Sequence, residues 1–242
     1  MLEKIELASL LGTFQATLTD FPYLSKEWSD NCKKEALLGV SLTGYFDNAL
    51  ARKDENLRLM RDKAIEINKV YAKKFGINES TCVTCIKPSG NSSQLLDTAS
   101  GMHPRYSSYY IRRVRVSSTD PIYKLMKDQG IACKPEVGQT EETATTWVLE
   151  FPVKAPENAI VKDDVSALEM LEEWKRLKVN FTEHNPSVTI YVGDNEWIEV
   201  ANWVYENWDI VGGLSFLPRS DFVYQLAPYE EITKEQYEAV LL

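Results

Sequence analysis

The stretch Lys87-Pro88-Ser89-Gly90-Asn91-Ser92-Ser93-Gln94 joins an apolar, β-rich run, residues 82–86, to a segment that can begin a helix. The Pro-Ser-Gly sequence predicts a turn, and its glycine lets the backbone approach a ligand closely. Ser and Asn often cap helices, and the free amides of a first helical turn can bind an anion. The residues alone therefore suggest a phosphate-binding turn, although similar sequences also form purely structural turns. The pattern is not the GxxxxGK[ST] loop of nucleotide triphosphatases.

Outward from this turn, strand-like and helical segments alternate. Residues 36–44 are nearly all apolar or small, as in a strand that is buried on both faces. A long amphipathic helix is predicted over 48–75, ending at Gly76. This order predicts an α/β unit with parallel strands. Further helices are predicted at 3–19, 120–130, 165–181, 197–208 and after Thr233, and further strands at 109–116, 145–153, 188–192 and 212–218.

The helix predicted at 3–19 carries an apolar stripe at helical spacing. Its members are Leu7, Leu10, Leu11, Phe14 and Leu18.

Composition limits the classes of function. The chain has 242 residues and a net charge of -9, which argues against a general nucleic-acid-binding protein. It has no apolar run of the roughly 18 residues that cross a bilayer, and the residues after Met1 do not resemble a signal peptide. We therefore expect no membrane association and a cytoplasmic location. Because no linker-like segment divides it, we expect residues 1–242 to form one structural unit.

The segment 87–115 departs from the overall acidic balance, with five basic residues and one acidic residue. A small anionic ligand nearby is one interpretation. The other is that its arginines pair with carboxylates elsewhere in the fold. The acidic pair Glu230-Glu231 is predicted to be solvated surface.

The cysteines and histidines form no diagnostic site for metal binding or catalysis. Cys82 and Cys85 have CxxC spacing, but no second such pair exists and both lie in a strand-like run, so we predict a structural role. Without a secretory signal, a disulfide framework is not expected. His103 and His184 have no Cys or Ser partner at a diagnostic spacing. We therefore expect no metal site and no catalytic residue in this chain.

Six segments, in this order, resemble one enzyme family. They are GVSLTG at 39–44, TCIKPSGNSS at 84–93, SGMHPRY at 100–106, YYIRRVR at 109–115, TEHNPSVT at 182–189 and GGLSFLP at 212–218. Together they are similar to the C-terminal half of the catalytic barrel of class II, adenosylcobalamin-dependent ribonucleotide reductases. The resemblance spans nearly the whole chain.

The resemblance implies a fold and a site. The fold would be α/β, half of a ten-stranded α/β barrel with parallel strands and flanking helices. The substrate phosphates, of a ribonucleoside di- or triphosphate, would bind to the turn residues, with support from three neighbours. The turn residues are Ser89, Gly90, Asn91, Ser92 and Ser93, and the neighbours are Pro88, His103 and Arg105. Adenosylcobalamin would be the cofactor, shared with the other half of the barrel.

Other family features are missing from this sequence. The Asn-Pro-Cys-x-Glu motif of the radical cysteine and the Cys-Asn-Leu segment do not occur, and no cysteine follows Cys133. In class I relatives paired tyrosines relay a radical at positions that look like Ser215 and Phe216 here, which favours radical generation by cobalamin. The resemblance thus implies a partner, the N-terminal half that carries the radical cysteine, and a thioredoxin-type reductant for the whole enzyme.

These observations predict the C-terminal component of a split or truncated oxidoreductase, inactive without its partner. It would convert ribonucleotides to 2'-deoxyribonucleotides by thiyl-radical chemistry, supplying DNA replication. The alternative is a non-catalytic remnant of the barrel that binds nucleotides or a protein partner. A third hypothesis is a CxxC metal or redox protein.

Overall fold

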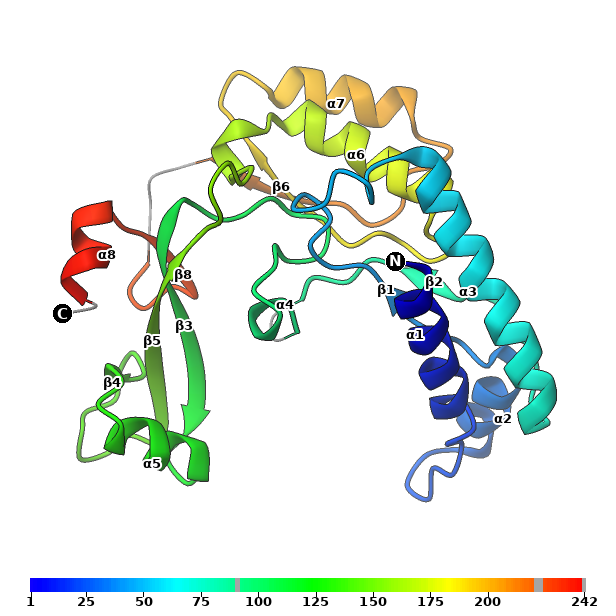
Figure 1. Cartoon of the computed structure of the whole chain (residues 1–242), viewed down its shortest axis with the longest axis horizontal. Helices are drawn as coiled ribbons and strands as arrows, with labels where there is room; N and C mark the ends of the chain where they lie inside the picture. The colour runs from blue at the N-terminus through cyan, green and yellow to red at the C-terminus, as the bar shows by residue number, and fades with distance from the viewer. Residues whose placement is uncertain (90–91, 220–223, 241–242) are drawn as a thin grey trace. The chain divides into compact units, whose positions relative to one another are not determined.

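The computed structural model describes residues 1–89, 92–219 and 224–240, and the chain divides into two compact units (Figure 1). Unit 1 consists of Met1–Pro104 and Asp164–Arg219, and unit 2 of Arg105–Asp163 and Ser220–Leu242. The sequence analysis expected a single unit because no linker is evident. Each unit combines two separated stretches of chain, so the division is not marked by linker composition.

Unit 1 contains short parallel strands and most of the helices. Its helices are α1 (Leu2–Gln15), α2 (Lys26–Glu35), α3 (Asp54–Phe75), α4 (Ser92–Leu95), α6 (Ala167–Asn180) and α7 (Trp197–Glu206). Its strands are β1 (Val40–Ser41), β2 (Thr84–Cys85), β6 (Thr189–Val192) and β7 (Ser215–Pro218). A short 3-10 helix, η1 (Lys162–Asp164), lies where the chain passes from unit 2 back to unit 1.

The strands of unit 1 form two parallel pairs, β1 with β2 and β6 with β7. A parallel bridge between Ile86 and Pro186 connects one pair to the other. The predicted strand at 36–44 and the β-rich run at 82–86 are longer than the ladders that form. Leu38 nevertheless donates its amide to the Cys82 carbonyl, so the chain stays extended before β1. The α/β prediction is confirmed in this coarse form.

The core of unit 1 includes one face of α6. Leu171, Trp174 and Leu177 follow one another at intervals of three residues and are fully buried. Ser166 caps the helix and forms a reciprocal capping box with Glu169. On the same helix the buried Glu173 accepts from Tyr45 Oη at 2.6 Å, and Arg52 and Arg176 donate to it at 2.6 and 2.8 Å. Burial by itself would raise the pKa of Glu173, but these bonds hold it below its usual value.

Helix α1 packs on α3 through its small and polar side rather than through the predicted apolar stripe. Ile5, Ser9 and Thr13 are buried. Ser9 Oγ donates to the Ala64 carbonyl at 2.8 Å, and Asn68 Nδ2 donates to Thr13 Oγ1 at 3.1 Å. These small side chains let the two helices approach closely, and their polar atoms are satisfied across the contact. Most of the apolar stripe is therefore left exposed.

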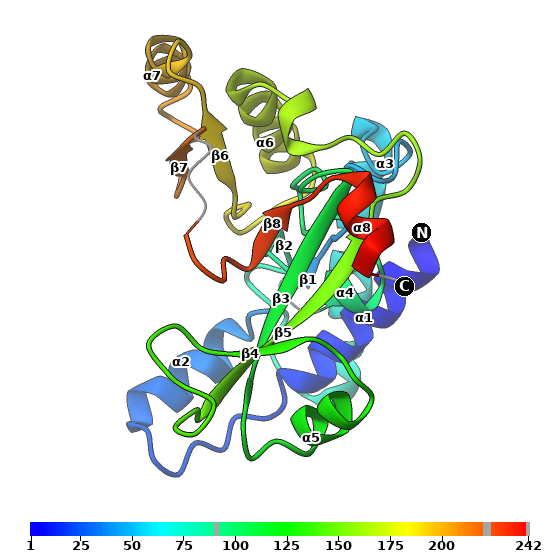
Figure 2. The same ribbon diagram turned by 90° about the vertical axis from the view of Figure 1, so that its left-hand side faces the viewer.

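Unit 2 is built on an antiparallel sheet in the order β4-β5-β3-β8. Its strands are β3 (Tyr109–Ser117), β4 (Cys133–Pro135), β5 (Thr146–Lys154) and β8 (Tyr229–Glu231), and its helices are α5 (Pro121–Asp128) and α8 (Lys234–Val240). Strands β3 and β5 pair along their full length, from Tyr109 opposite Lys154 to Ser117 opposite Thr146 (Figure 2). This sheet corrects the expectation of parallel strands throughout the chain.

The arginines of β3 are paired inside unit 2. Arg113 is buried and donates to Glu150 at 2.7 Å and to Glu230 at 2.5 Å. Arg115 forms an ion pair with Glu136. The interpretation that arginines of this segment pair with carboxylates elsewhere in the fold is confirmed for Arg113 and Arg115. Glu230, predicted to be solvated surface, has 41% of its side chain exposed and also pairs with Arg113. The charge of these two arginines is used within the sheet and is not free for an anionic ligand.

Candidate functional site

The serine-rich turn follows β2 directly and is held by neighbouring strands of unit 1. Lys87 donates its amide to Ser41 Oγ at 3.1 Å, while Ile86 forms the bridge to Pro186. Of the predicted phosphate-binding residues, Gly90 and Asn91 lie outside the described residues. The helix after the turn, α4, has only four residues. A single helical turn has little dipole, so hydroxyl and amide groups have to supply the site's donors.

Ser89 is the centre of a hydrogen-bond network that closes the turn. Its hydroxyl accepts from the Ser93 amide at 2.8 Å and lies 2.6 Å from Ser92 Oγ. Its carbonyl accepts from the hydroxyls of Ser93 at 2.6 Å and Ser100 at 2.9 Å. Its amide donates to Ser100 Oγ at 2.9 Å. Every polar group of Ser89 is thus engaged, and the described part of the turn is preorganised.

The three described serines of the turn have different environments. Ser93 is fully buried, and its hydroxyl is used to hold Ser89. Ser92 is exposed. The hydroxyls of Ser89 and Ser92 share one hydrogen bond, in which one of them donates its proton to the other. Among the described contacts, the hydroxyl that accepts in this bond keeps its own proton available for a ligand. Ser92 and Ser89 can therefore contact a ligand, whereas Ser93 positions the turn.

The charge at the turn comes from Lys87. Its side chain is exposed, as is that of Pro88, and within the described ranges no carboxylate forms an ion pair with it. Lys87 precedes Ser89 by two residues, so one short segment carries both an ammonium group and several hydroxyl groups, a combination that suits a phosphate group. The sequence analysis did not single out Lys87 as a ligand residue.

The backbone at Gly101 packs closely against the backbone at Lys87, at the start of the turn. Gly101 has a φ of +56°, and a Cβ at this position would lie 2.6 Å from the Lys87 carbonyl oxygen. The Gly101 amide donates to Thr43 Oγ1 at 3.0 Å. This geometry lets Ser100 reach Ser89. Sequence reasoning missed Ser41, Thr43 and Ser100 as supports, although all three lie in the segments that carry the family resemblance.

His103 is a structural bridge rather than a cation at the site. The Thr189 amide donates to its Nε2 at 2.9 Å, and its Nδ1 lies 3.0 Å from the Ser100 carbonyl. Nε2 therefore accepts and Nδ1 carries the proton, which defines the neutral ring. Burial lowers its pKa below the usual value. Arg105, its predicted companion, is buried in unit 2, where its amide donates to the Ile160 carbonyl.

We expect His103 to make unit 1 sensitive to acid. Folding lowers the pKa of His103, so below about pH 6.5 the unfolded chain binds one more proton than the folded chain. The free energy of unfolding therefore falls as the pH drops through that value. Gln can make both hydrogen bonds without titrating. His103→Gln should therefore lose less stability than the wild type between pH 7.5 and 5.5, measured by urea unfolding at each pH. Equal losses in both proteins would contradict the neutral-bridge assignment.

The cysteines show no sign of metal or redox chemistry in the described part of the chain. All four are free thiols. Burial raises the pKa of both Cys82 and Cys85, which favours their protonated, less nucleophilic form. Within the described ranges, no group of three or more His, Cys, Asp or Glu side chains could hold a metal ion. None of the described helices has the length and apolar character that a bilayer crossing requires.

Comparison with known proteins gives a consistent result. No family model matches the chain. It is 32% identical over 215 residues to an adenosylcobalamin-dependent ribonucleoside-triphosphate reductase of Lactobacillus delbrueckii subsp. bulgaricus, covering 87% of this chain and 28% of that protein. A reductase of the same name from Euglena gracilis is 26% identical over 266 residues, covering 99% of this chain and 36% of that protein. The chain thus spans about a quarter to a third of the length of these relatives.

A solved structure supports the fold. The crystal structure of a B12-dependent (class II) ribonucleotide reductase matches with a TM-score of 0.78 at 24% identity, covering 97% of this chain and 37% of that chain. This likeness confirms an α/β fold shared with part of that enzyme. That the strands of unit 1 form half of a ten-stranded barrel stays a prediction.

Proposed function

We propose that this chain, a homologue of part of the class II, adenosylcobalamin-dependent ribonucleotide reductases, is the portion of such an enzyme that holds the substrate's phosphates. The complete enzyme would reduce ribonucleoside triphosphates, the substrate class in the names of the relatives, to 2'-deoxyribonucleotides by thiyl-radical chemistry. The serine turn with Lys87 is the observation that carries the proposal. Cytoplasmic supply of deoxyribonucleotides for DNA replication follows as its biological role.

The turn suits a phosphate chemically. It combines the exposed hydroxyl of Ser92, the Ser89 hydroxyl and the exposed ammonium of Lys87. Bonds from hydroxyl and ammonium groups to a charged phosphate are about twice as strong as neutral ones. Because Ser93 and Ser100 already hold Ser89 in place, little ordering would be needed on binding. Gly90 and Asn91 complete the proposed set.

The chemistry needs residues that this sequence does not contain. No Asn-Pro-Cys-x-Glu motif occurs, and the chain spans only 28% of its Lactobacillus relative. The radical cysteine and the reducible cysteines would come from the remaining part of the reductase, with a thioredoxin-type reductant for turnover. In the described sheets β1 and β7 each pair with one strand only, and such edges are normally covered by further protein. We infer that the chain is inactive by itself.

Adenosylcobalamin would belong to the complete enzyme. When bound, it supplies the organic radical that starts the reaction. The cavity beside Trp28, of about 480 Å³, is far smaller than a corrinoid with its nucleoside arms, and the serine turn is suited to anions. These residues do not fit the cofactor, and we assign none of them to it.

The proposal is tested by reconstitution. The chain is mixed with the N-terminal part of the reductase that carries the radical cysteine, and reduction of ribonucleoside triphosphates is assayed with adenosylcobalamin and a dithiol. We expect activity only in the mixture, together with a one-to-one complex in light scattering. Activity of the chain alone would overturn the proposal. Nucleotide binding without complex formation or activity would favour the non-catalytic remnant.

We expect Ser92→Ala to weaken substrate binding with little effect on folding. One hydrogen bond to a charged group contributes about 1.5–3 kcal/mol, which corresponds to a KM roughly tenfold higher or more with kcat nearly unchanged. Since Ser92 is exposed, the free energy of unfolding should stay within about 0.5 kcal/mol. Ser108→Ala, at an exposed serine of unit 2, is the control. An unchanged KM in Ser92→Ala would remove Ser92 from the site.

A further inference from the structure

The outer face of α1 carries an apolar surface that the fold leaves exposed. Leu7, Leu11, Phe14 and Leu18 are 59%, 67%, 55% and 65% exposed. The spacing of Leu7, Leu11 and Phe14, four and three residues, keeps these three on one side of α1, opposite the buried Ile5, Ser9 and Thr13. Leu18 follows three residues after the helix ends at Gln15. From Leu7 to Phe14 the stripe extends about 10 Å along the helix axis.

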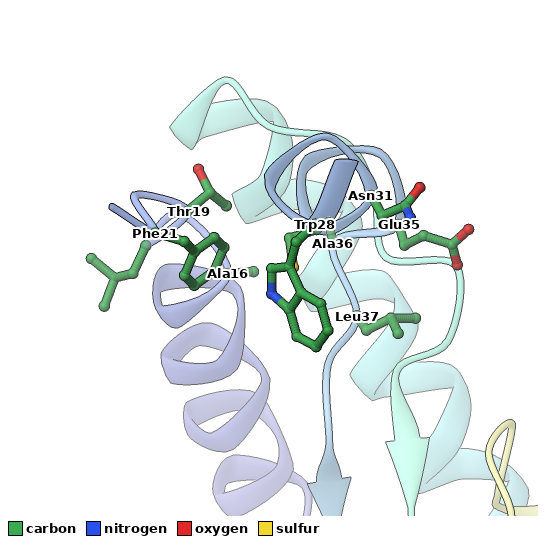
Figure 3. Close-up of a pocket in the computed structure, with 10 residues that line it drawn as sticks. Ala16, Thr19, Phe21, Trp28, Asn31, Glu35, Ala36 and Leu37 are labelled. Atoms are coloured by element: carbon green, nitrogen blue, oxygen red, sulfur yellow. The ribbon is translucent and has the colours of Figure 1, made fainter. Parts of the chain in front are cut away.

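A cavity of about 480 Å³ continues this stripe beyond the end of α1. Leu18 belongs to both, and the cavity is further lined by Ala16, Phe21, Trp28 and Leu37. The ring of Trp28 lies between Phe21 and Leu37, with Asn31 and Glu35 at one side (Figure 3). Trp28 and Leu37 are themselves 56% and 54% exposed. We call the stripe and the cavity together the α1 surface.

The comparison with the solved reductase indicates what covers the α1 surface. The match includes 97% of this chain, so about 3% of 242 residues, roughly seven, lie outside it. Helix α1 has 14 residues, so even if all the unmatched residues lay in α1, about half of the helix would still belong to the shared fold. That match covers only 37% of the larger chain, which leaves most of the reductase fold unaccounted for. Contiguous exposed apolar patches of this kind mark interaction sites in soluble proteins.

We propose that the α1 surface docks an amphipathic helix from the remaining part of the reductase fold, whether that part is in the same polypeptide or a separate one. This proposal rests on the proposed function. A straight stripe at helical spacing fits a helix that presents Leu, Ile or Phe every three to four residues. The cavity accepts one bulky apolar side chain of that helix as an anchor. Asn31 and Glu35 at its margin favour a hydrogen-bond donor beside the anchor.

The test uses the N-terminal part of the reductase that carries the radical cysteine as its probe. Leu11→Glu places a charge in the centre of the stripe, and because Leu11 is 67% exposed the variant should fold. We expect its affinity for the probe to fall at least tenfold in isothermal titration. The matched control is Ile198→Glu on α7, which is 85% exposed and lies outside the α1 surface. It should bind like the wild type.

Thiol labelling gives a second readout. Cys32 lines the cavity and is partly exposed, whereas Cys133 lies in unit 2. The probe should slow maleimide labelling of Cys32 and leave Cys133 unchanged, as measured by peptide mass spectrometry.

The outcomes separate this proposal from the proposed function. A complex that forms equally well with Leu11→Glu, and without protection of Cys32, overturns the α1 surface but leaves the reductase assignment intact. No complex with the wild-type chain overturns both. A wild-type chain that dimerises through this surface, with Leu11→Glu monomeric, would assign the surface to a second copy instead.

Discussion

Gly101→Ala should strongly destabilise unit 1 and abolish nucleotide binding by the serine turn. A Cβ at this position would lie 2.6 Å from the Lys87 carbonyl oxygen, and neither backbone segment can yield without moving the turn. A left-handed φ of +56° costs an alanine about 1–2 kcal/mol, and overpacking adds about 1–3 kcal/mol. We therefore expect a loss of about 2–5 kcal/mol in the free energy of unfolding, measured in urea.

The matched control for this variant is Gly76→Ala at the end of α3. Gly76 also has a left-handed φ, of +70°, but a Cβ there would have no neighbour within 4 Å. Its substitution should cost only the conformational part, about 1–2 kcal/mol, and leave nucleotide affinity unchanged. The difference between the two variants measures the close approach at Lys87. If both variants lose the same stability and both still bind nucleotide, Gly101 does not shape the turn.

Local signals made several helices predictable. The end of α3 at Gly76, the Asp120 cap of α5 and the apolar spacing of α6 all follow from residues within one or two turns of each other. Strands were less predictable, because β4 and β8 have only three residues each and form through pairing with distant segments. The β8 residue Glu230, for example, depends on Arg113 for its role.

Helix α1 illustrates the limit of hydrophobic periodicity. Its pattern correctly predicts a helix, but the direction of its buried face depends on partners that lie 55 residues away, at Ala64 and Asn68. Ser9 and Thr13 gain bonds there that no local signal encodes. An apolar stripe identifies a face that will be covered, and it does not specify whether this chain or another protein segment covers it.

The serine-rich turn was predictable from its motif, whereas its supports were not. Pro-Ser-Gly followed by hydroxyl residues indicated a turn, and its phosphate binding stays a prediction for which Ser89 and Ser92 have hydroxyl groups available. The contributions of Ser41 and Thr43 require β1 to lie beside β2, so they arise only in the folded chain. His103 likewise looked like a site residue in sequence, while its two bonds identify it as a bridge between segments.

Trp174→Ala should cause the second large effect. Trp174 is completely buried, its ring meets Trp203 edge to face at 6.3 Å, and its Nε1 donates to the Pro186 carbonyl at 2.8 Å. Removing a buried aromatic side chain costs about 3–5 kcal/mol, and the Pro186 carbonyl would lose its donor. Because Pro186 bridges to Ile86 immediately before the serine turn, nucleotide affinity should fall together with stability.

Two further variants separate packing from the hydrogen bond. Trp174→Phe retains most of the buried ring and removes the Nε1 donor, so we expect a smaller loss of about 1–3 kcal/mol in the free energy of unfolding. We also expect faster hydrogen exchange at the Ser187 amide, which donates to the Ile86 carbonyl. Trp208→Ala, at a position 71% exposed, should change neither stability nor affinity. If Trp174→Phe matched the wild type in exchange at Ser187 and in affinity, the bond to Pro186 would not couple α6 to the turn. The loss in Trp174→Ala would then be one of packing alone.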